Sequence, residues 1–325
     1  MDNYYDNGYI AGQNEKRAIY RAARVIAVPG ILFFLVTRFW GEILLFSGQK
    51  LGFAREKIIE AFNEPAVLQV LQAGLSLFLL TVPFIVCAKI AEADISKITA
   101  LKKPEGDNSF VYFLFGLGFC AFANIAVSFA GRIFESFGID FSVPESEYPQ
   151  GVFGFLLVVL STAVVPALVE EFAFRGIVFG MLKPFGEAFA IFASAAAFGV
   201  LHGNFEQMPF AFLVGLALGF VRAKTDSLVI CMAIHAANNF IAVLSNYMTF
   251  VPSVLRNIIY TVYVMLALTL SVLGVAYLKR GDEFTLKRAD TANTTKKVYV
   301  YFFFSPAFII FVMLFLFRAI MYIVE

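Results

Sequence analysis

The sequence predicts an all-α protein, a polytopic bundle of about eight or nine transmembrane helices. Of its 325 residues, 60% are hydrophobic and only 15% are charged, and the mean hydropathy is +0.79. Soluble domains contain about 45–50% apolar and about 25% charged residues, so this composition excludes an ordinary water-soluble fold. Several apolar runs also reach the roughly 20 residues that a helix needs to cross a bilayer. The net charge of +1 gives no indication of nucleic-acid binding.

The apolar residues form nine segments, which we expect to be helices of the membrane bundle. Their bounds are roughly 25–46, 67–90, 110–130, 152–182, 187–202, 208–222, 228–245, 257–278 and 299–324. Residues 1–24 form a polar, cytosolic tail without the pattern of a cleavable signal peptide. Three segments lie within 25–150, a catalytic core occupies 151–246, and two further segments, joined by a basic loop, occupy 247–325.

The positive charges indicate the orientation of the bundle. Seventeen of the 25 lysine and arginine residues lie on the side of the N-terminus, and five lie on the opposite side. This bias predicts that the N-terminus faces the cytosol. The remaining three arginines lie inside segments. We expect Arg38 to pair with Glu42 on one helix face, and Arg318 to snorkel or to cap a packing contact.

Segment four contains three formal charges within the stretch Val169–Arg175. A charged side chain at the bilayer centre costs about 2.5–3.5 kcal/mol on insertion scales, and such residues usually face a bundle interior or a water-filled cavity. Glu171 and Arg175 are four residues apart and can pair on one face. Glu170 lies about 100° around the helix and has no such partner. We therefore expect Glu171 and Arg175 to form a structural pair, which leaves Glu170 free for chemistry.

The two histidines lie on later segments of the same core. His202 ends segment five, and His235 lies in segment seven, four residues before Asn239. At about 1.5 Å per residue, Glu170 is about 18 Å from the inner end of segment four, and His202 is about 22 Å from the start of segment five. These depths agree only if segment four is long. Pro166 removes a backbone hydrogen bond there and can bend the helix. Segments four to six also carry glycine pairs that permit close helix packing, at Gly176/Gly180, Gly199/Gly203 and Gly215/Gly219.

Three motifs occur in order on successive segments, namely Glu170-Glu171-x-x-x-Arg175, Phe198-x-x-x-His202 and His235-x-x-x-Asn239. This ordered set resembles the CAAX-protease and bacteriocin-processing (CPBP, or Abi) family, which includes the Ras-converting CAAX endopeptidases. The resemblance covers about residues 152–245. It implies a glutamic-type intramembrane endopeptidase without a metal or other cofactor.

The resemblance also implies a role for each motif. Glu170 and His202 would activate a water, and His235 and Asn239 would donate hydrogen bonds to the oxyanion. Glu171, Arg175 and Phe198 would support them. The substrate would be a peptide or protein at the membrane, either lipidated or a secreted peptide precursor. The absence of an organelle address favours a bacterial plasma membrane.

Two alternatives remain open at this stage. A zinc protease could use His202, His235 and a glutamate, although no His-Glu-x-x-His motif occurs and the histidines lie on different segments. The three cysteines (Cys87, Cys120 and Cys231) are widely spaced in apolar segments, so we expect them to be buried free thiols and not a disulfide or zinc framework. A non-catalytic immunity or scaffold protein, or a proton-coupled transporter, could also keep polar residues in the membrane. Against transport, the chain has no internal repeat.

Overall fold

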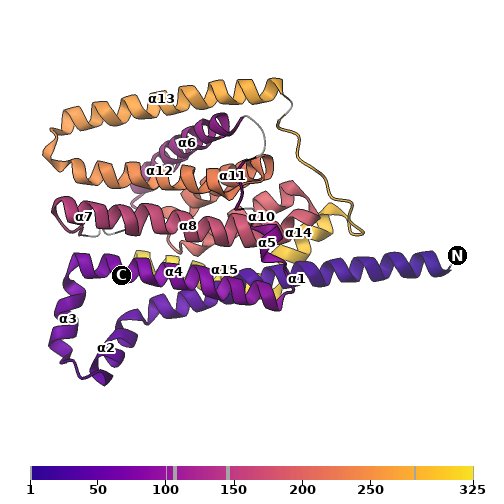
Figure 1. Ribbon diagram of the computed structural model, residues 1–325, viewed down its shortest axis with the longest axis horizontal. Helices are drawn as coiled ribbons and strands as arrows, with labels where there is room; N and C mark the ends of the chain where they lie inside the picture. The colour runs from indigo at the N-terminus through magenta and orange to yellow at the C-terminus, as the bar shows by residue number, and fades with distance from the viewer. Residues whose placement is uncertain (1, 100, 105–107, 144–146, 282, 325) are drawn as a thin grey trace.

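The computed structural model describes residues 2–99, 101–104, 108–143, 147–281 and 283–324, and these residues form helices and connections without a strand (Figure 1). In the first half of the chain the helices are α1 (Asp2–Arg38), α2 (Trp40–Lys50), α3 (Arg55–Asn63), α4 (Pro65–Ile90), α5 (Ile95–Ile98), α6 (Ser109–Ser136) and α7 (Gly151–Val158). The fourth span continues through η1 (Val159–Val164), α8 (Val165–Glu171), η2 (Phe172–Val178), α9 (Phe179–Leu182) and η3 (Lys183–Phe185). The remaining helices are α10 (Glu187–Leu201), α11 (Gln207–Thr225), α12 (Leu228–Tyr247), η4 (Met248–Phe250), α13 (Ser253–Arg280), α14 (Thr295–Phe303) and α15 (Pro306–Val324).

Eight of these helical stretches are long and apolar enough to cross a membrane, which confirms the prediction of a polytopic helical bundle. They comprise Tyr9–Arg38, Pro65–Ile90, Ser109–Ser136, Gly151–Phe185, Gln207–Thr225, Leu228–Phe250, Ser253–Arg280 and Pro306–Ile323. The ninth expected segment is α10, an apolar helix of 15 residues. At about 1.5 Å per residue α10 measures about 22 Å, which is less than the roughly 30 Å thickness of the hydrocarbon core.

Two of the expected segments are interrupted. The first ends its span at Arg38, and after a bend at Phe39 the chain continues as α2. The expected pair between Arg38 and Glu42 is therefore wrong, because no ion pair joins them and the Arg38 guanidinium lies 5.9 Å from the centre of the Phe39 ring. The last segment divides into α14 and α15 just before Pro306, where a proline disfavours helical backbone at the preceding residue.

The fourth span is one continuous helical stretch of 35 residues, as the depth argument required. It is not uniformly α-helical, because the π-helical turns η1 and η2 flank the α8 turn that carries the two glutamates. Pro166 opens α8 directly after η1, where the wider π-turn tolerates the missing backbone donor. π-helical turns are frequent at functional sites, and here they bracket the charged stretch.

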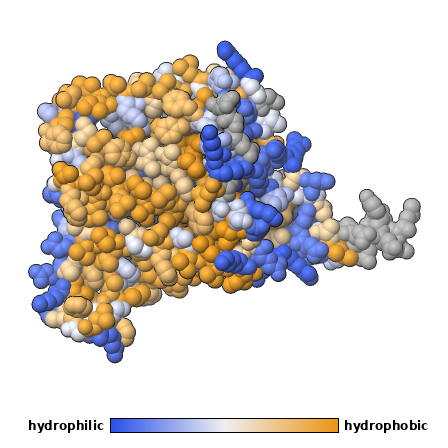
Figure 2. Space-filling model, in the orientation of Figure 1, coloured by the Kyte–Doolittle hydropathy of each residue, from blue (hydrophilic) through white to orange (hydrophobic). Residues whose placement is uncertain are grey.

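The spans lie side by side along one axis (Figure 1). Helix α1 packs on α4 and α15, α6 packs on α13, and the hairpin of α10 and α11 lies between them. Hydrophilic residues gather at the end of the molecule that holds the N-terminal part of α1, a smaller number lie at the opposite end, and a broad hydrophobic band lies between them (Figure 2). We call the end that holds the N-terminal part of α1 the basic end, because most of the lysines and arginines lie there, among them Lys16, Lys183 and Lys279. We call the opposite end, which holds Glu60 and Glu135, the acidic end.

Candidate active site

A cavity of about 510 Å³ lies within the bundle, and the four residues expected to be catalytic line it together. They come from three different elements: Glu170 from α8, His202 from the end of α10, and His235 and Asn239 from α12. Phe198 forms part of the same wall. Three motifs that are up to 69 residues apart in the sequence therefore face one space inside the membrane-spanning part of the chain.

The two neighbouring glutamates have different surroundings. The Glu170 side chain is 17% exposed and lines the cavity, whereas Glu171 is 0% exposed and lies behind the wall. Oε1 of Glu171 accepts a hydrogen bond of 3.1 Å from Nη1 of Arg175, which is also fully buried. The expected Glu171–Arg175 pair is therefore present. The guanidinium of Arg175 also stacks on Phe198, with Cζ 4.2 Å from the ring centre.

His235 joins the two glutamates. Its Nδ1 lies 2.9 Å from Oε1 of Glu171, and its Nε2 lies 3.8 Å from Oε2 of Glu170. An ionised carboxylate can only accept hydrogen bonds, so Nδ1 of His235 carries a hydrogen and donates a hydrogen bond to Glu171. This contact holds the imidazole ring in place with Nε2 turned towards the cavity. An imidazolium at this position could donate from Nε2, with the buried Glu171 as its counter-ion.

His202 is oriented by its own helix. Its Nδ1 lies 2.9 Å from the backbone oxygen of Phe198, one turn earlier, and a carbonyl oxygen requires a donor. The Nδ1 proton is therefore used, and Nε2 of the neutral ring is an acceptor. The Phe198 and His202 rings meet edge to face with centres 4.9 Å apart. Because His202 lines the cavity, its Nε2 can accept a proton or a hydrogen bond from a water there.

Asn239 is fixed by two contacts. Its Nδ2 donates to the backbone oxygen of Thr162 at 3.0 Å, and its Oδ1 accepts from Nδ2 of Asn238 at 3.1 Å. The Thr162 carbonyl belongs to the π-helical turn η1, so this turn supplies the acceptor that orients the amide. The second hydrogen on Nδ2 of Asn239 stays available to a group in the cavity.

Several cavity residues were not expected from the sequence. Asn238 lies beside Asn239, and α1 and α4 contribute a wall, although no motif marked them. The cavity-lining residues of these two helices are Phe33, Thr37, Gln72, Leu75 and Ser76. A signal was present in α4, since Gln69, Gln72 and Ser76 form a polar stripe at spacings of three and four on an apolar helix. Gln69 is buried, and its Oε1 accepts a 2.6 Å hydrogen bond from Ser161.

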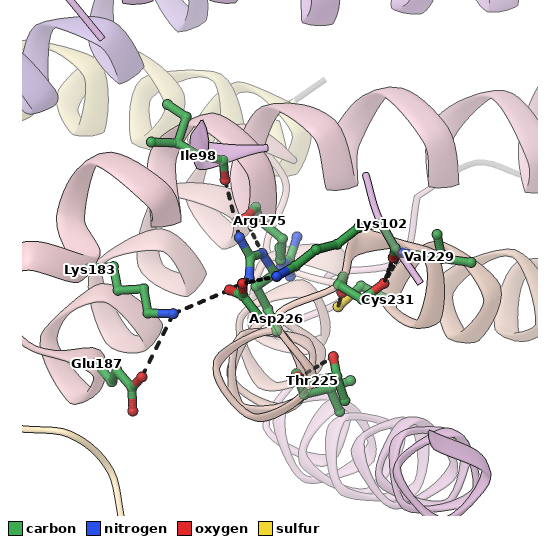
Figure 3. Close-up of polar contacts among 12 residues, drawn as sticks. Ile98, Lys102, Arg175, Lys183, Glu187, Thr225, Asp226, Val229 and Cys231 are labelled. Carbon is green, nitrogen blue, oxygen red and sulfur yellow. Dashed lines mark hydrogen bonds and ion pairs between the residues drawn. The ribbon is translucent and has the colours of Figure 1, made fainter. Parts of the chain in front are cut away.

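A second polar cluster surrounds Asp226 (Figure 3). Arg222 is 2% exposed, and its Nε donates to the backbone oxygen of Arg175 at 3.2 Å. Its Nη2 donates to the backbone oxygen of Ile98, and its Nη1 donates to Asp226 at 2.6 Å. Arg222 therefore attaches the π-helical turn that carries Arg175 to α5 and to the end of α11. Sequence reasoning placed Arg222 only in a cytosolic connection.

Asp226 is the centre of this cluster. Figure 3 shows its carboxylate between Lys183 and Lys102, at 3.3 Å and 2.8 Å. Partial burial opposes ionisation, but hydrogen bonds from Lys102 and Arg222 and the charges of Arg222 and Lys183 outweigh it. Together they hold the pKa of Asp226 well below its usual range. The carboxylate stays charged and completes the ion pairs that surround Arg222.

The described residues contain no group of three His, Cys, Asp or Glu side chains arranged to hold a metal ion. The three cysteines are free, as expected, with Cys120 and Cys231 buried and Cys87 partly buried. Arg318, whose role the sequence left between snorkelling and packing, donates from Nη1 to the hydroxyl of Thr37 at 3.4 Å, so it joins α15 to α1.

Residues 152–241 match the family model described as Type II CAAX prenyl endopeptidase Rce1-like. The matched stretch runs from α7 into α12 and contains all seven residues of the three motifs. Comparison with curated proteins and with solved structures gave no match. The matched family is one of membrane-embedded CAAX-type proteases, and the eight apolar spans agree with such a setting.

Proposed function

Because this multi-pass membrane chain carries an Rce1-like domain of the CAAX-protease (CPBP) family at residues 152–241, we propose that it is an intramembrane endopeptidase of the glutamic type. Its substrate is a peptide or protein segment at the membrane, and we place the enzyme in a bacterial plasma membrane. The observation that supports this best is the division between the glutamates: Glu170 lines the cavity, while Glu171 is sealed behind it and holds His235.

The proposed first step is attack by a water held between Glu170 and His202. The carboxylate of Glu170 accepts one proton of the water, Nε2 of His202 orients the water, and the oxygen forms a bond to the scissile carbonyl carbon. The carbonyl oxygen becomes an oxyanion. Nε2–H of His235 and Nδ2–H of Asn239 lie on the opposite helix and donate to it.

In the second step the tetrahedral intermediate breaks down. The C–N bond is cleaved, and Glu170 returns its proton to the leaving amine, which restores the carboxylate. Donors that are already oriented lower the barrier without reorganisation, and each is typically worth about 2.7–4 kcal/mol. Glu171, Arg175 and Phe198 do not touch the substrate in this scheme. They hold His235 and His202 in position.

The test compares the peptides that are cleaved in membranes containing the wild-type chain and the Glu170→Gln variant. Loss of the general base is expected to lower the rate by about 10²–10⁴ while the variant still inserts and folds. Glu60→Gln on the exposed face of α3 is a matched control, and it should cleave normally. Cleavage by Glu170→Gln at the wild-type rate would falsify the proposed mechanism.

The zinc alternative is tested separately with a chelator. In the proposed mechanism both Nδ1 atoms of the histidines are already engaged, by Glu171 and by the Phe198 carbonyl, and the water needs no metal. Cleavage should therefore continue after treatment with a strong chelator. If the chelator abolished cleavage and added zinc restored it, His202, His235 and Glu170 would instead form a metal site.

A further inference from the structure

The two ends of the bundle differ in charge, and this difference indicates which end faces the cytosol. The seventeen lysines and arginines of the basic end lie in the N-terminal part of α1, at Lys89 in the last turn of α4, and within residues 91–104, 183–187, 222–227 and 279–297 of the sequence. The acidic end instead collects the carboxylates of Glu56, Glu60, Glu64, Glu135, Asp140, Glu147 and Glu206. Lysine and arginine accumulate on the cytosolic side of membrane proteins, so the basic end is cytosolic.

Fully buried side chains lie between the cavity and this basic end. Along the fourth span, Phe174, Ile177 and Phe179 follow Glu170 towards the basic end, and each is 0% exposed. The Arg222 cluster lies on this same side of Glu170 and His235. Glu171 and Arg175 are also fully buried. A peptide that approached from the cytosol would have to displace both the aromatic layer and the ion pairs of Asp226 and Arg222.

The other walls of the cavity extend towards the acidic end. Thr37 lies in the last turn of α1, and Gln72 and Ser76 lie in the outer half of α4, which begins at the acidic end with Pro65. The hairpin of α10 and α11 starts at the basic end and turns near His202, and its tip contacts the acidic-end connection, where Glu206 accepts a 2.7 Å hydrogen bond from the backbone nitrogen of Val143. Gln207, at the tip of this hairpin, is exposed and lines the cavity.

We infer that the cavity admits its substrate from the extracytoplasmic side of the membrane. This inference rests on the proposed function and narrows its substrate class. The substrate is a peptide segment delivered at the outer face, such as a secreted peptide precursor or the outer juxtamembrane segment of a membrane protein. A prenylated C-terminus in the cytosol would meet the closed end of the site.

Thiol labelling of intact cells tests the direction of access without requiring cleavage. Ser76→Cys places a thiol inside the cavity by a near-isosteric change. A membrane-impermeant maleimide added outside the cells should label it, because a thiolate forms only where water reaches the sulfur. Lys296→Cys, exposed at the basic end, should be labelled only after permeabilisation. The parent chain with its three native cysteines gives the background.

Two further variants control the experiment. Glu60→Cys, exposed at the acidic end, should react in intact cells and thus confirms the orientation independently of the cavity. Thr269→Cys lies on the outward face of α13 in the hydrophobic band and should stay unlabelled from either side. If Ser76→Cys reacts only after permeabilisation, or if Lys296→Cys reacts in intact cells, the inference is overturned.

The products separate this inference from the proposed function. Peptides whose release depends on Glu170 should appear in the external medium, at least tenfold above their level with Glu170→Gln. Glu170-dependent cleavage of a prenylated cytosolic protein would overturn the direction of access and keep the endopeptidase. Absence of any Glu170-dependent cleavage would overturn the endopeptidase, and with it the substrate class, while the labelling result would still report which end of the cavity is open.

Discussion

His235 and Glu171 are 64 residues apart in the sequence, yet Nδ1 of the histidine lies 2.9 Å from Oε1 of the glutamate. The same oxygen also accepts from Arg175, so one buried atom joins α8, η2 and α12. Glu171 is thus more than the partner of Arg175, which is all that helix spacing indicated. It sets the ring orientation of a histidine that faces the cavity.

Glu171→Gln is expected to lower both stability and activity. A glutamine leaves Arg175 as an uncompensated buried charge, and breaking a buried ion pair on one side typically costs about 3–5 kcal/mol. Thermal unfolding of the purified protein in detergent should show a clear drop in Tm. Glu170→Gln should unfold close to the wild-type temperature, because Glu170 is partly exposed and its contact with His235 is long, at 3.8 Å. Equal Tm losses in the two variants would contradict the assigned division of roles.

Asn239→Ala is expected to reduce kcat by about 10²–10³ with a small change in KM. The lost donor acts on the oxyanion, whose charge appears only in the transition state. Asn238→Ala is the neighbouring control: it removes a contact to Asn239 but no proposed oxyanion donor, so its kcat should fall less. Steady-state kinetics on a cleaved peptide measures both. A larger kcat loss for Asn238→Ala would exchange the roles of the two asparagines.

Arg222→Ala is expected to destabilise the protein although it lies outside the cavity. The substitution takes the side-chain donor from the Arg175 and Ile98 carbonyls, which should cost about 1–3 kcal/mol for each buried group left unsatisfied, whereas Asp226 keeps its lysine partners. Arg21→Ala removes an arginine from an exposed ion pair with Glu92 and should cost about 1 kcal/mol or less. Comparison of Tm tests the difference. An unchanged Tm for Arg222→Ala would show that the cluster does not hold η2.

Gly215→Ala is expected to disturb the Arg175 pair through packing. A Cβ at this position would lie 3.0 Å from Cα and Cβ of Ala195 and 3.3 Å from Nη2 of Arg175, so α10 and α11 would have to separate. Overpacking of this kind typically costs about 1–3 kcal/mol. Gly74→Ala in α4 meets open space and serves as the matched control. Tm and cleavage rate should both fall for Gly215→Ala alone.

Much of the site could be predicted because it depends on contacts within one helix. Four-residue spacing brings Glu171 to Arg175 and His202 to the carbonyl of Phe198 whatever the rest of the bundle does. The prediction failed for Arg38 and Glu42, which have the same spacing. There the helix bends at Phe39 between them, and periodicity alone does not reveal a break in an apolar run.

The sequence by itself determined that the chain crosses the membrane several times, that its basic residues gather on one side, and that Glu170, His202, His235 and Asn239 belong together. Only the tertiary structure decided that Glu171 holds His235, that α1 and α4 complete the cavity wall, and that fully buried side chains lie between this cavity and the basic end. The physical reason is that hydropathy and helical spacing act locally along the chain. Contacts between helices depend on how their surfaces pack, and distant residues set that packing.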